Sequence, residues 1–576
     1  MTISPEAARR RRLLFRLAPV VAVGAFGVGV IAGAGSEAPA ATRFLEAWED
    51  GDYEAMHAEL TPESRDEHPL KEFQRAYEEA ATTATIRSVD VGEEKIGGDL
   101  VSAPVKFETY AFGSLSGTLE VPLEDGQVDW GPELVYPGLE EGERLTRRTR
   151  APQRAAILAA DRSPLARGPA AARSVQSGAL AVVGEVGTPE RRQAKELAAR
   201  GFPPGTLAGT SGLELAFDER LAGRPGGQLL ATKAGDENAL AGGREIASSE
   251  PVRGEPVRTT IDPEIQSAAV TALGGLYGGV AVLDARDGSV LALAGLGYSA
   301  PQPPGSTFKV ITATAALDAG VVKPSDEFPV EISNHDIGRE IANSHDSPCG
   351  GTFVTSFAKS CNTVFAPLGV DVGGEKLVET AELFGFNEPP AMLNEAATAA
   401  LKPPASTLPT DLDSSVAIGE TAIGQGQVLA TPLQMATVAQ TIANGGKRMP
   451  TPITKDPELA PDSEPVEVTS PETAQTIRQM MIEVVNNGTG TAAAVDGVQV
   501  AGKTGTAELG PAALSAGETL GEGEEPPQET DAWFTAFAPA NKPKLAVAVM
   551  IVESEGDGGE VAAPIAQQIL ASALSK

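Results

Sequence analysis

Residues 301–310 read PQPPGSTFKV and place Ser306 and Lys309 three positions apart, at the start of an apolar run that ends at Gly320. The preceding prolines and glycine, with the apolar run behind them, predict that Ser306 begins a buried helix. Residues three apart on a helix share a face, so the Lys309 amine can take the proton of the Ser306 hydroxyl and make it a nucleophile. The same S-x-x-K pattern recurs at Ser356 and Lys359, and the motif alone does not separate the two copies.

Two further short motifs follow Ser306, and each occurs once in the chain: Ser360-Cys361-Asn362 and Lys503-Thr504-Gly505-Thr506. Successive motifs are 54 and 143 residues apart. Each is weak alone, but together and in this order they indicate one site. Ser356 lies four residues before Ser360 and lacks the Pro-Gly lead-in, so we predict that Ser306 is the nucleophile.

Helix and strand patterns alternate around these motifs. Asp262-Pro263 marks a helix start, and two apolar strands meet at the Asp287-Gly288 turn. Thr431 is predicted as an N-cap whose capping box is completed by Gln434. Two strands, DAWFTAFAP and KLAVAVMIVE, precede a last helix from about Ala562. Such a mixture predicts an α/β domain whose β-sheet is covered by helices on both faces.

The motif set resembles that of the penicillin-binding proteins and serine β-lactamases: S-x-x-K, S-x-N and K-T-G. The blocks TTIDPEIQ, GVAVLDARDGSVLAL, IGQG, ATPLQMA and DAWFTAFAP look like the transpeptidase domain of penicillin-binding proteins. RAAILAADRSPLA and GTSGLELAFDERLAG resemble their pedestal, or dimerisation, domain, although the usual R-G-x-I-x-D-R reads QRAAILAADR here. Residues 40–137 are similar to the NTF2-like domain of one class B subgroup, which includes low-affinity, methicillin-resistance-type members.

These patterns and this resemblance predict a multidomain chain of α+β and α/β class. We expect an NTF2-like α+β domain of helices followed by strands at 38–137. An irregular pedestal with extended arms follows at 138–257. The transpeptidase domain occupies 258–576. Within the last domain, residues 508–531 carry seven carboxylates and no Lys or Arg, which predicts a mobile loop at the rim of the cleft.

The N-terminus predicts a membrane anchor. Residues 17–35 are 19 residues without charge, preceded by five arginines at 9–12 and 16. As a helix they would span about 28 Å, close to the thickness of a bilayer's hydrocarbon core. The arginines predict a cytoplasmic tail at 1–16 and an extracytoplasmic catalytic domain, in a single-pass protein of the cell membrane. A cleaved signal peptide is the competing interpretation, because small residues follow the run.

The resemblance implies a role for each motif residue. Ser306 would attack the carbonyl of a terminal D-Ala-D-Ala, with Lys309 as the base. Ser360 would relay a proton to the leaving amine, and Asn362 would hold Lys309 and the substrate amide. Lys503 would supply positive charge and Thr506 a hydroxyl for the substrate carboxylate, with Thr504, Gly505 and Thr506 as substrate-binding residues. The backbone N–H groups of Ser306 and Thr506 would form an oxyanion hole. Gly505 would let its strand approach the ligand closely.

Cys349 and Cys361 are the two cysteines of the chain. Outside the cytoplasm they can form a disulfide that closes a short loop, or they can remain two thiols. The four histidines do not have zinc-finger spacing to them, so we expect no metal and no cofactor.

A formal charge of −33 argues against a nucleic acid partner. The implied partners are peptidoglycan stem peptides, as D-Ala-D-Ala donor and amine acceptor, β-lactam antibiotics, and a membrane glycosyltransferase. The predicted function is a D,D-transpeptidase that cross-links stem peptides through an acyl-enzyme on Ser306. The alternatives are a D,D-carboxypeptidase or a β-lactamase on the same fold, and a non-catalytic membrane sensor of β-lactams or muropeptides.

Overall fold

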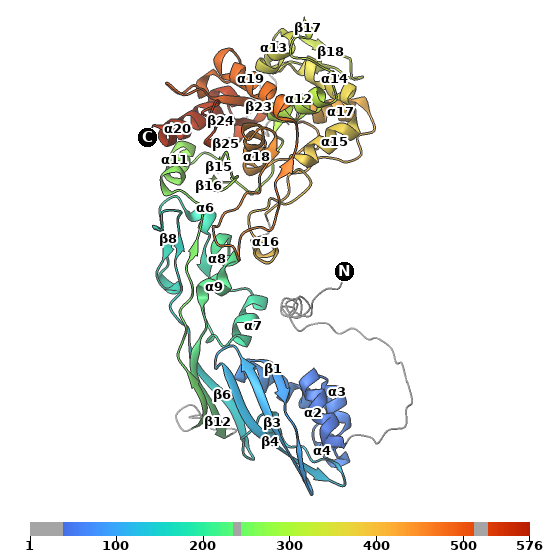
Figure 1. The fold of residues 1–576 in the computed structure, drawn as a ribbon, viewed down its shortest axis with the longest axis vertical. Helices are drawn as coiled ribbons and strands as arrows, with labels where there is room; N and C mark the ends of the chain where they lie inside the picture. Colours follow the sequence, from blue (N-terminus) through green and yellow to red (C-terminus); the bar gives the residue numbers. More distant parts are fainter. Residues whose placement is uncertain (1–38, 234–242, 402, 512–527, 576) are drawn as a thin grey trace, which may run out of the picture.

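The computed structural model describes residues 39–233, 243–401, 403–511 and 528–575 and shows an elongated molecule (Figure 1). A domain of helices and one sheet forms one end, the domain with the three motifs forms the other, and an extended segment connects them. The predicted anchor at 17–35 and most of the acidic segment at 508–531 lie outside the described residues. Within the described ranges, no helix is long and apolar enough to cross a membrane.

In the N-terminal domain, four helices precede a curved antiparallel sheet of order β1-β3-β4-β5, with β2 paired to β3. The predicted order of helices followed by strands is present, and α2 ends at Gly51 in the left-handed conformation (φ 74°). Aromatic side chains fill the core, and the indole N–H of Trp130 donates to the hydroxyl of buried Tyr77 at 3.1 Å. The elements are α2 (Ala40–Asp50), α3 (Tyr53–Ala58), α4 (Pro62–Glu67), α5 (Leu70–Ala84), β1 (Ile86–Val91), β2 (Lys95–Gly97), β3 (Leu100–Thr109), β4 (Ser114–Glu124), β5 (Gln127–Val128) and η1 (Pro132–Val135).

The middle segment is more regular than the sequence predicts. A three-stranded antiparallel sheet, β13-β12-β6, forms its long arms, and a four-stranded sheet, β14-β7-β8-β9, lies closer to the motif-bearing domain (Figure 1). Its elements are β6 (Glu143–Arg150), β7 (Ile157–Leu158), β8 (Pro164–Arg167), η2 (Ala170–Ala172), β9 (Ser174–Val175), α6 (Leu180–Val183), β10 (Val186–Gly187), α7 (Arg191–Ala199), β11 (Ala208–Gly209), α8 (Gly212–Ala216), α9 (Asp218–Ala222), β12 (Gly226–Lys233), β13 (Arg244–Ser249) and β14 (Val257–Arg258).

A buried ion cluster holds this segment together at the predicted GTSGLELAFDERLAG joint. The Arg154 guanidinium donates to Glu214 at 2.7 Å and to Asp218 at 2.8 Å, and Arg173 donates to the other oxygen of Glu214 at 2.7 Å. Arg154 belongs to the QRAAILAADR stretch. Although this stretch departs from the usual motif, its arginine still forms the buried ion pairs. The end of that stretch forms the β7–β8 turn, with Arg162 at φ 72°.

The motif-bearing domain is built on a five-stranded antiparallel sheet of order β16-β15-β25-β24-β23. Helices α11 and α20 cover one face, and α18 packs on the other against β15, β24 and β25. β24 separates the two cores, because Phe534 and Ala536 face α20 while Trp533 and Phe537 face the α18 side. β23, the strand that carries Lys503, is the last strand in this order. It therefore lies at the sheet edge, with one of its two sides unpaired.

Local signals placed several of these elements correctly. Asp262 caps α11 by accepting from the N–H groups of residues 264 and 265, and Thr431 caps α18 by accepting from the N–H of Gln434. The capping-box prediction is wrong in its second half. The Gln434 amide instead donates to the carbonyl of Phe384 at 2.8 Å, because α18 is buried and a tertiary partner lies within reach.

The elements of this domain are α11 (Pro263–Leu273), β15 (Gly278–Asp284), β16 (Val290–Gly295), η3 (Gly305–Phe308), α12 (Lys309–Asp318), β17 (Glu327–Glu331), β18 (Ser333–Asn334), β19 (Ile341–Ala342), η4 (Ser344–Asp346), β20 (Cys349–Thr352), α13 (Phe353–Ala358), α14 (Asn362–Val372), α15 (Gly374–Leu383), α16 (Glu395–Leu401), α17 (Ser415–Ala422), α18 (Pro432–Ala443), β21 (Lys447–Arg448), β22 (Val466–Glu467), α19 (Pro471–Asn487), η5 (Thr491–Ala493), β23 (Ala501–Pro511), β24 (Gln528–Ala538), β25 (Leu545–Ser554), η6 (Gly558–Ala562) and α20 (Ala563–Leu574).

Candidate active site

The predicted nucleophile lies in a tight turn at the start of a buried helix. Ser306 belongs to the 3₁₀ turn η3, which continues directly into α12. Gly305, in the left-handed region at φ 51°, donates its N–H to the carbonyl of Gly424 at 3.0 Å. A Cβ atom at Gly305 would lie 2.5 Å from the carbonyl oxygen of Thr506. The turn is thus fixed between the IGQG loop and the KTG strand, and only glycine fits at position 305.

Gly505 makes a close backbone approach within the protein. A Cβ atom there would lie 2.6 Å from the carbonyl oxygen of Pro304 and 3.0 Å from the Cβ of Trp533. Gly505 therefore lets the KTG strand pack against the lead-in to Ser306. Its close approach to a ligand stays a prediction.

Two lysines meet at the hydroxyl of Ser360. The Nζ of Lys503 donates to Ser360 Oγ at 2.8 Å, and the Nζ of Lys309 lies 3.3 Å from the same oxygen. Lys309 also donates to the Ser360 carbonyl at 2.7 Å and to Asn362 Oδ1 at 2.6 Å. All three motifs, far apart in sequence, are thus joined by hydrogen bonds around one serine.

The hydrogen-bond count at Ser360 has a chemical consequence. A hydroxyl oxygen has two lone pairs and one proton. Lys503 donates to one lone pair, and both N–H bonds of a neutral Lys309 go to the Ser360 carbonyl and Asn362 Oδ1, so the lone pair of Lys309 faces the Ser360 hydroxyl. After Ser360 donates its proton, either lysine can therefore supply a replacement.

Burial changes the proton affinity of both lysines, whose side chains are fully buried. Burial, followed by the charge of Lys503, holds the pKa of Lys309 well below its usual range. Burial lowers the pKa of Lys503 to about 7. The rings of Phe365 and Phe357 lie 5.6 Å from the Nζ atoms of Lys309 and Lys503 respectively. Near pH 7, these pKa values favour a neutral Lys309 beside a Lys503 that is charged in only part of the molecules.

Ser360 is held by its backbone as well as by the lysines. It lies between α13 and α14 at φ 64°, a left-handed conformation that non-glycine residues rarely adopt. The next residue, Cys361, is joined to Cys349 of β20 by a disulfide. Asn362 then opens α14, and its Nδ2 donates to the carbonyl of Ala342 at 2.9 Å while its Oδ1 accepts from Lys309. A strained residue at a reactive position, held by a covalent bond on its neighbour, indicates a fixed functional geometry.

The two threonines of the KTG strand point to one face of β23, because they are two residues apart. The hydroxyl of Thr504 lies 2.5 Å from that of Thr489, and the hydroxyl of Thr506 accepts from the N–H of Gly558 at 3.4 Å. Thr489 lies in the turn after α19, and no sequence pattern had predicted its place in the site.

The second S-x-x-K copy does not form a comparable pair. Ser356 is fully buried in α13, whereas Lys359 is exposed to solvent. No hydrogen-bond partner exists for the Ser356 hydroxyl among the described residues. Its side chain packs in the helix that leads to Ser360, so this copy has a structural role.

Comparison with known proteins identifies the family. The family model for the penicillin binding protein transpeptidase domain matches residues 278–571, half of the chain. This chain belongs to the class B penicillin-binding proteins. Two further models match ahead of that domain: the penicillin-binding protein dimerisation domain at 169–259 and the NTF2-like N-terminal transpeptidase domain at 36–143.

Relatives and solved structures agree with this assignment. The penicillin-binding protein is 35% identical to the peptidoglycan D,D-transpeptidase PbpA of Mycolicibacterium smegmatis, over 59% of its own length and 77% of the relative. A ceftriaxone acyl-enzyme of penicillin-binding protein A from M. tuberculosis is 28% identical, with a TM-score of 0.56, over 73% of this chain and 98% of that one. A D,D-transpeptidase domain from Eggerthella lenta is 27% identical, with a TM-score of 0.56, over 74% and 98%.

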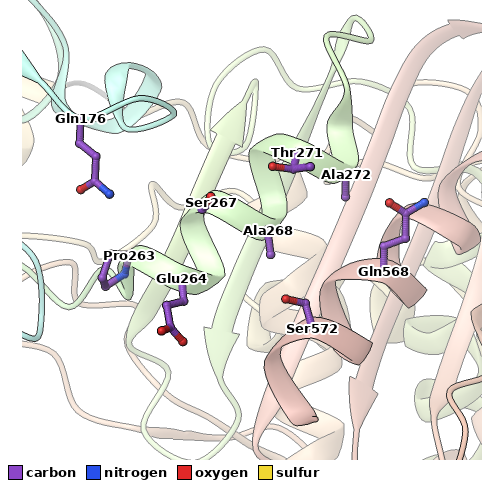
Figure 2. Close-up of a pocket in the computed structure, with 9 residues that line it drawn as sticks. All are labelled: Gln176, Pro263, Glu264, Ser267, Ala268, Thr271, Ala272, Gln568 and Ser572. Atoms are coloured by element: carbon purple, nitrogen blue, oxygen red, sulfur yellow. The ribbon is translucent and has the colours of Figure 1, made fainter. Parts of the chain in front are cut away.

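This penicillin-binding protein also has a groove away from the lysines. Figure 2 shows a cavity of about 600 Å³ between α11 and α20, lined by Gln176, Pro263, Glu264, Ser267, Ala268, Thr271, Ala272, Gln568 and Ser572. Glu264 is its one titratable side chain, and none of the motif residues contributes to it. In the parts of the chain that the structure describes, no group of three or more His, Cys, Asp or Glu side chains can hold a metal ion.

Proposed function

We propose that this penicillin-binding protein is a peptidoglycan D,D-transpeptidase that cross-links stem peptides through an acyl-enzyme on Ser306. The observation that carries the proposal is the Ser360 hydroxyl, which faces the buried amines of Lys309 and Lys503 at 3.3 and 2.8 Å. Acyl transfer needs a base for the nucleophile and an acid for the leaving amine. In this arrangement a neutral lysine can act as the base, and a charged lysine can supply the acid's proton.

In the acylation step, Ser306 Oγ attacks the carbonyl carbon between the two terminal D-alanines. Its proton passes to neutral Lys309 as the C–O bond forms. The N–H groups of Ser306 and Thr506 would hold the oxyanion, assisted by the positive end of η3 and α12. Donors fixed in place by the Gly305 contacts need no rearrangement when that charge develops.

The intermediate collapses when the C–N bond breaks. Ser360 gives its proton to the departing nitrogen and regains one from Lys309, which returns to its neutral form. Free D-alanine leaves, and the peptide remains esterified to Ser306. An acceptor amine of a second stem peptide attacks the ester, and its proton follows the same route in reverse to restore the Ser306 hydroxyl.

The proposal includes the cellular setting. Residues 17–35 form a single membrane anchor, residues 1–16 lie in the cytoplasm, and the catalytic domain is extracytoplasmic. The partners are D-Ala-D-Ala stem peptides, β-lactam antibiotics and a membrane glycosyltransferase that supplies uncross-linked glycan. The charge pattern of residues 9–35 and the Cys349–Cys361 disulfide support an extracytoplasmic site.

Labelling with fluorescent penicillin tests the function, with intact mass and peptide mapping over time and Ser306→Ala as the variant. We expect a long-lived adduct on the peptide with Ser306 and none in the variant. A D-alanine exchange assay on a pentapeptide then separates transfer from hydrolysis. An adduct that forms and quickly disappears would indicate a β-lactamase, release of D-alanine without exchange a carboxypeptidase, and no adduct a non-catalytic sensor.

A further inference from the structure

We propose that Thr489 is a positioning residue that holds the Thr504 hydroxyl as a donor toward the substrate's terminal carboxylate. This inference rests on the proposed function, in which the KTG strand recognises that carboxylate. The two hydroxyl oxygens lie 2.5 Å apart, and Thr504 is 6% exposed whereas Thr489 lies at the surface. They come from different elements, β23 and the turn after α19, so their contact is made by the tertiary fold.

The turn that carries Thr489 is anchored to the helix before Ser360. The N–H of Thr489 donates to the carbonyl of Ala358, the last residue of α13, at 3.2 Å. The backbone of Thr489 is therefore fixed relative to both the S-x-N and the K-T-G motifs. Its hydroxyl arrives at Thr504 in a defined position.

A hydroxyl carries one proton, so a pair of hydroxyls has two possible directions. If Thr504 donated to Thr489, it would present only lone pairs to an incoming carboxylate and would repel it. If Thr489 donates to Thr504, the Thr504 proton is free for the anion. Carboxylate binding selects the second direction, and the chain of two hydroxyls then strengthens the outer hydrogen bond by polarisation.

Thr506 shows the same device with a different donor. Its hydroxyl accepts from the N–H of Gly558, at the start of η6. An amide can only donate here, so the proton of Thr506 is also left free. Both hydroxyls on this face of β23 thus receive a hydrogen bond from the protein. One donor is the backbone amide of Gly558, and the other is the side chain of Thr489.

The test compares acylation of the full chain in detergent by benzylpenicillin and by its methyl ester, which lacks the carboxylate. For Thr489→Val we expect the second-order acylation rate with benzylpenicillin to fall about 10- to 100-fold, as for loss of a hydrogen bond to a charged group. The rate with the methyl ester should change by less than about threefold, on the same principle. Thr489→Ser keeps the hydroxyl and is the matched control, with rates close to wild type.

A double-mutant cycle completes the test. In a Thr504→Val background, Thr489→Val should cause no further loss, because its effect passes through the Thr504 hydroxyl. Equal losses with acid and ester, additive losses in the cycle, or an unaffected Thr489→Val would each overturn this inference while Ser306 still becomes acylated. A wild-type chain that neither compound acylates would overturn the proposed function itself, and this inference with it.

Discussion

At the scale of single residues, the site depends on two lysines whose protonation differs. Lys309 must be neutral to take the Ser306 proton, and its low pKa follows from burial and from the charge of Lys503. In the proposed function, Lys503 supplies positive charge for the substrate carboxylate and is therefore most effective when protonated. Burial brings its pKa to about 7, so part of that charge is lost in the neutral range.

These directions predict a bell-shaped pH dependence of acylation by benzylpenicillin. Toward acid, the rate falls as Lys309 becomes protonated; above about pH 7, it falls as Lys503 loses its charge. With the methyl ester, the fall on the basic side should be absent, because no carboxylate is recognised. Stopped-flow acylation rates between pH 5 and 9 measure both profiles, and identical basic limbs would contradict the role of Lys503.

Asp531 gives a second prediction at this scale, on stability. Its Oδ1 accepts from the N–H of Glu553 at 3.1 Å, while Oδ2 is buried without a partner among the described residues. Burial, then the backbone hydrogen bond and the Glu553 charge, leave its pKa raised to about 6. The folded state thus binds a proton more readily than the unfolded state between about pH 4 and 6, and this contribution to stability is lost as pH rises through 6.

Asp531→Asn should imitate the protonated carboxyl and keep the bond from Glu553. We expect the variant to be more stable than wild type above pH 6, by about 1–3 kcal/mol for relief of one unsatisfied buried group. The two proteins should converge only below about pH 4, where Asp531 is protonated in the unfolded chain as well as in the folded one. Thermal unfolding across this range measures the difference, and a constant offset at all pH values would contradict the explanation.

The residue scale also shows what the sequence could predict. Ser306, Lys309, Ser360, Asn362 and Lys503 were predicted because acyl transfer needs those side chains in a recognisable order. The structure joins the last four by hydrogen bonds and places Ser306 one turn before Lys309. Thr489 was not predicted, because a Gly-Thr-Gly turn carries no chemical pattern of its own. The sequence also could not show that Gly505 lies against the carbonyl of Pro304.

At the scale of elements, the connection between β20 and α14 is covalent. The Cys349–Cys361 disulfide closes a loop with a sequence separation of 12, and Cys361 stands between Ser360 and Asn362. The bond therefore fixes the start of α14, and with it two of the groups that contact Lys309. The S-x-N motif is held by its middle residue.

Removing this bond should affect stability and rate together. For Cys349→Ser with Cys361→Ser, we expect the free energy of unfolding to fall by about 2–4 kcal/mol, as for other loops of this size. Acylation should slow as well, because Ser360 and Asn362 lose a fixed backbone. Calorimetry and acylation rates measure both effects. Dithiothreitol should reproduce them in wild type and leave the double variant unchanged; an unaltered acylation rate would mean that the bond serves stability alone.

Elements with local signals were predicted well, and elements made by distant pairing were not. Asp262 and Thr431 cap their helices as expected, because a cap is written in four consecutive residues. The arms β6 and β12 were expected to be irregular. Their register pairs Arg150 with Gly226, and β6 is rich in arginine, so no apolar alternation marked it as a strand.

At the scale of the whole molecule, the middle segment joins the cores of both neighbouring domains. Leu145 and Leu229 pack in the N-terminal core, and Val183 and Phe217 pack in a core shared with the motif-bearing domain. Within the segment, the buried Arg154, Glu214 and Asp218 cluster ties α8 and α9 to the stretch that begins at Arg154. We expect this ion cluster to add to the rigidity that the apolar contacts provide.

Arg154→Met should loosen this segment without touching the catalytic residues. Loss of the guanidinium leaves buried Asp218 without its ion-pair partner and Glu214 with Arg173 alone, and breaking a buried ion pair typically costs about 3–5 kcal/mol. Hydrogen exchange should show that loss in α8 and α9, since a multidomain chain has no single unfolding midpoint. Arg148→Met, on the exposed face of β6, is the matched control and should leave exchange unchanged. Equal exchange in the two variants would contradict the role of the cluster.

The elongated arrangement in Figure 1 makes the middle segment a lever. A rotation of a few degrees at either joint leaves every bond around Ser360 intact, yet it sweeps Ser306 along an arc whose length grows with the length of the arm. Chemistry and reach are therefore controlled at different places in the chain. The catalytic domain carries the groups that make the bond, and the stiffness of the pedestal sets how far those groups can move relative to the N-terminal domain.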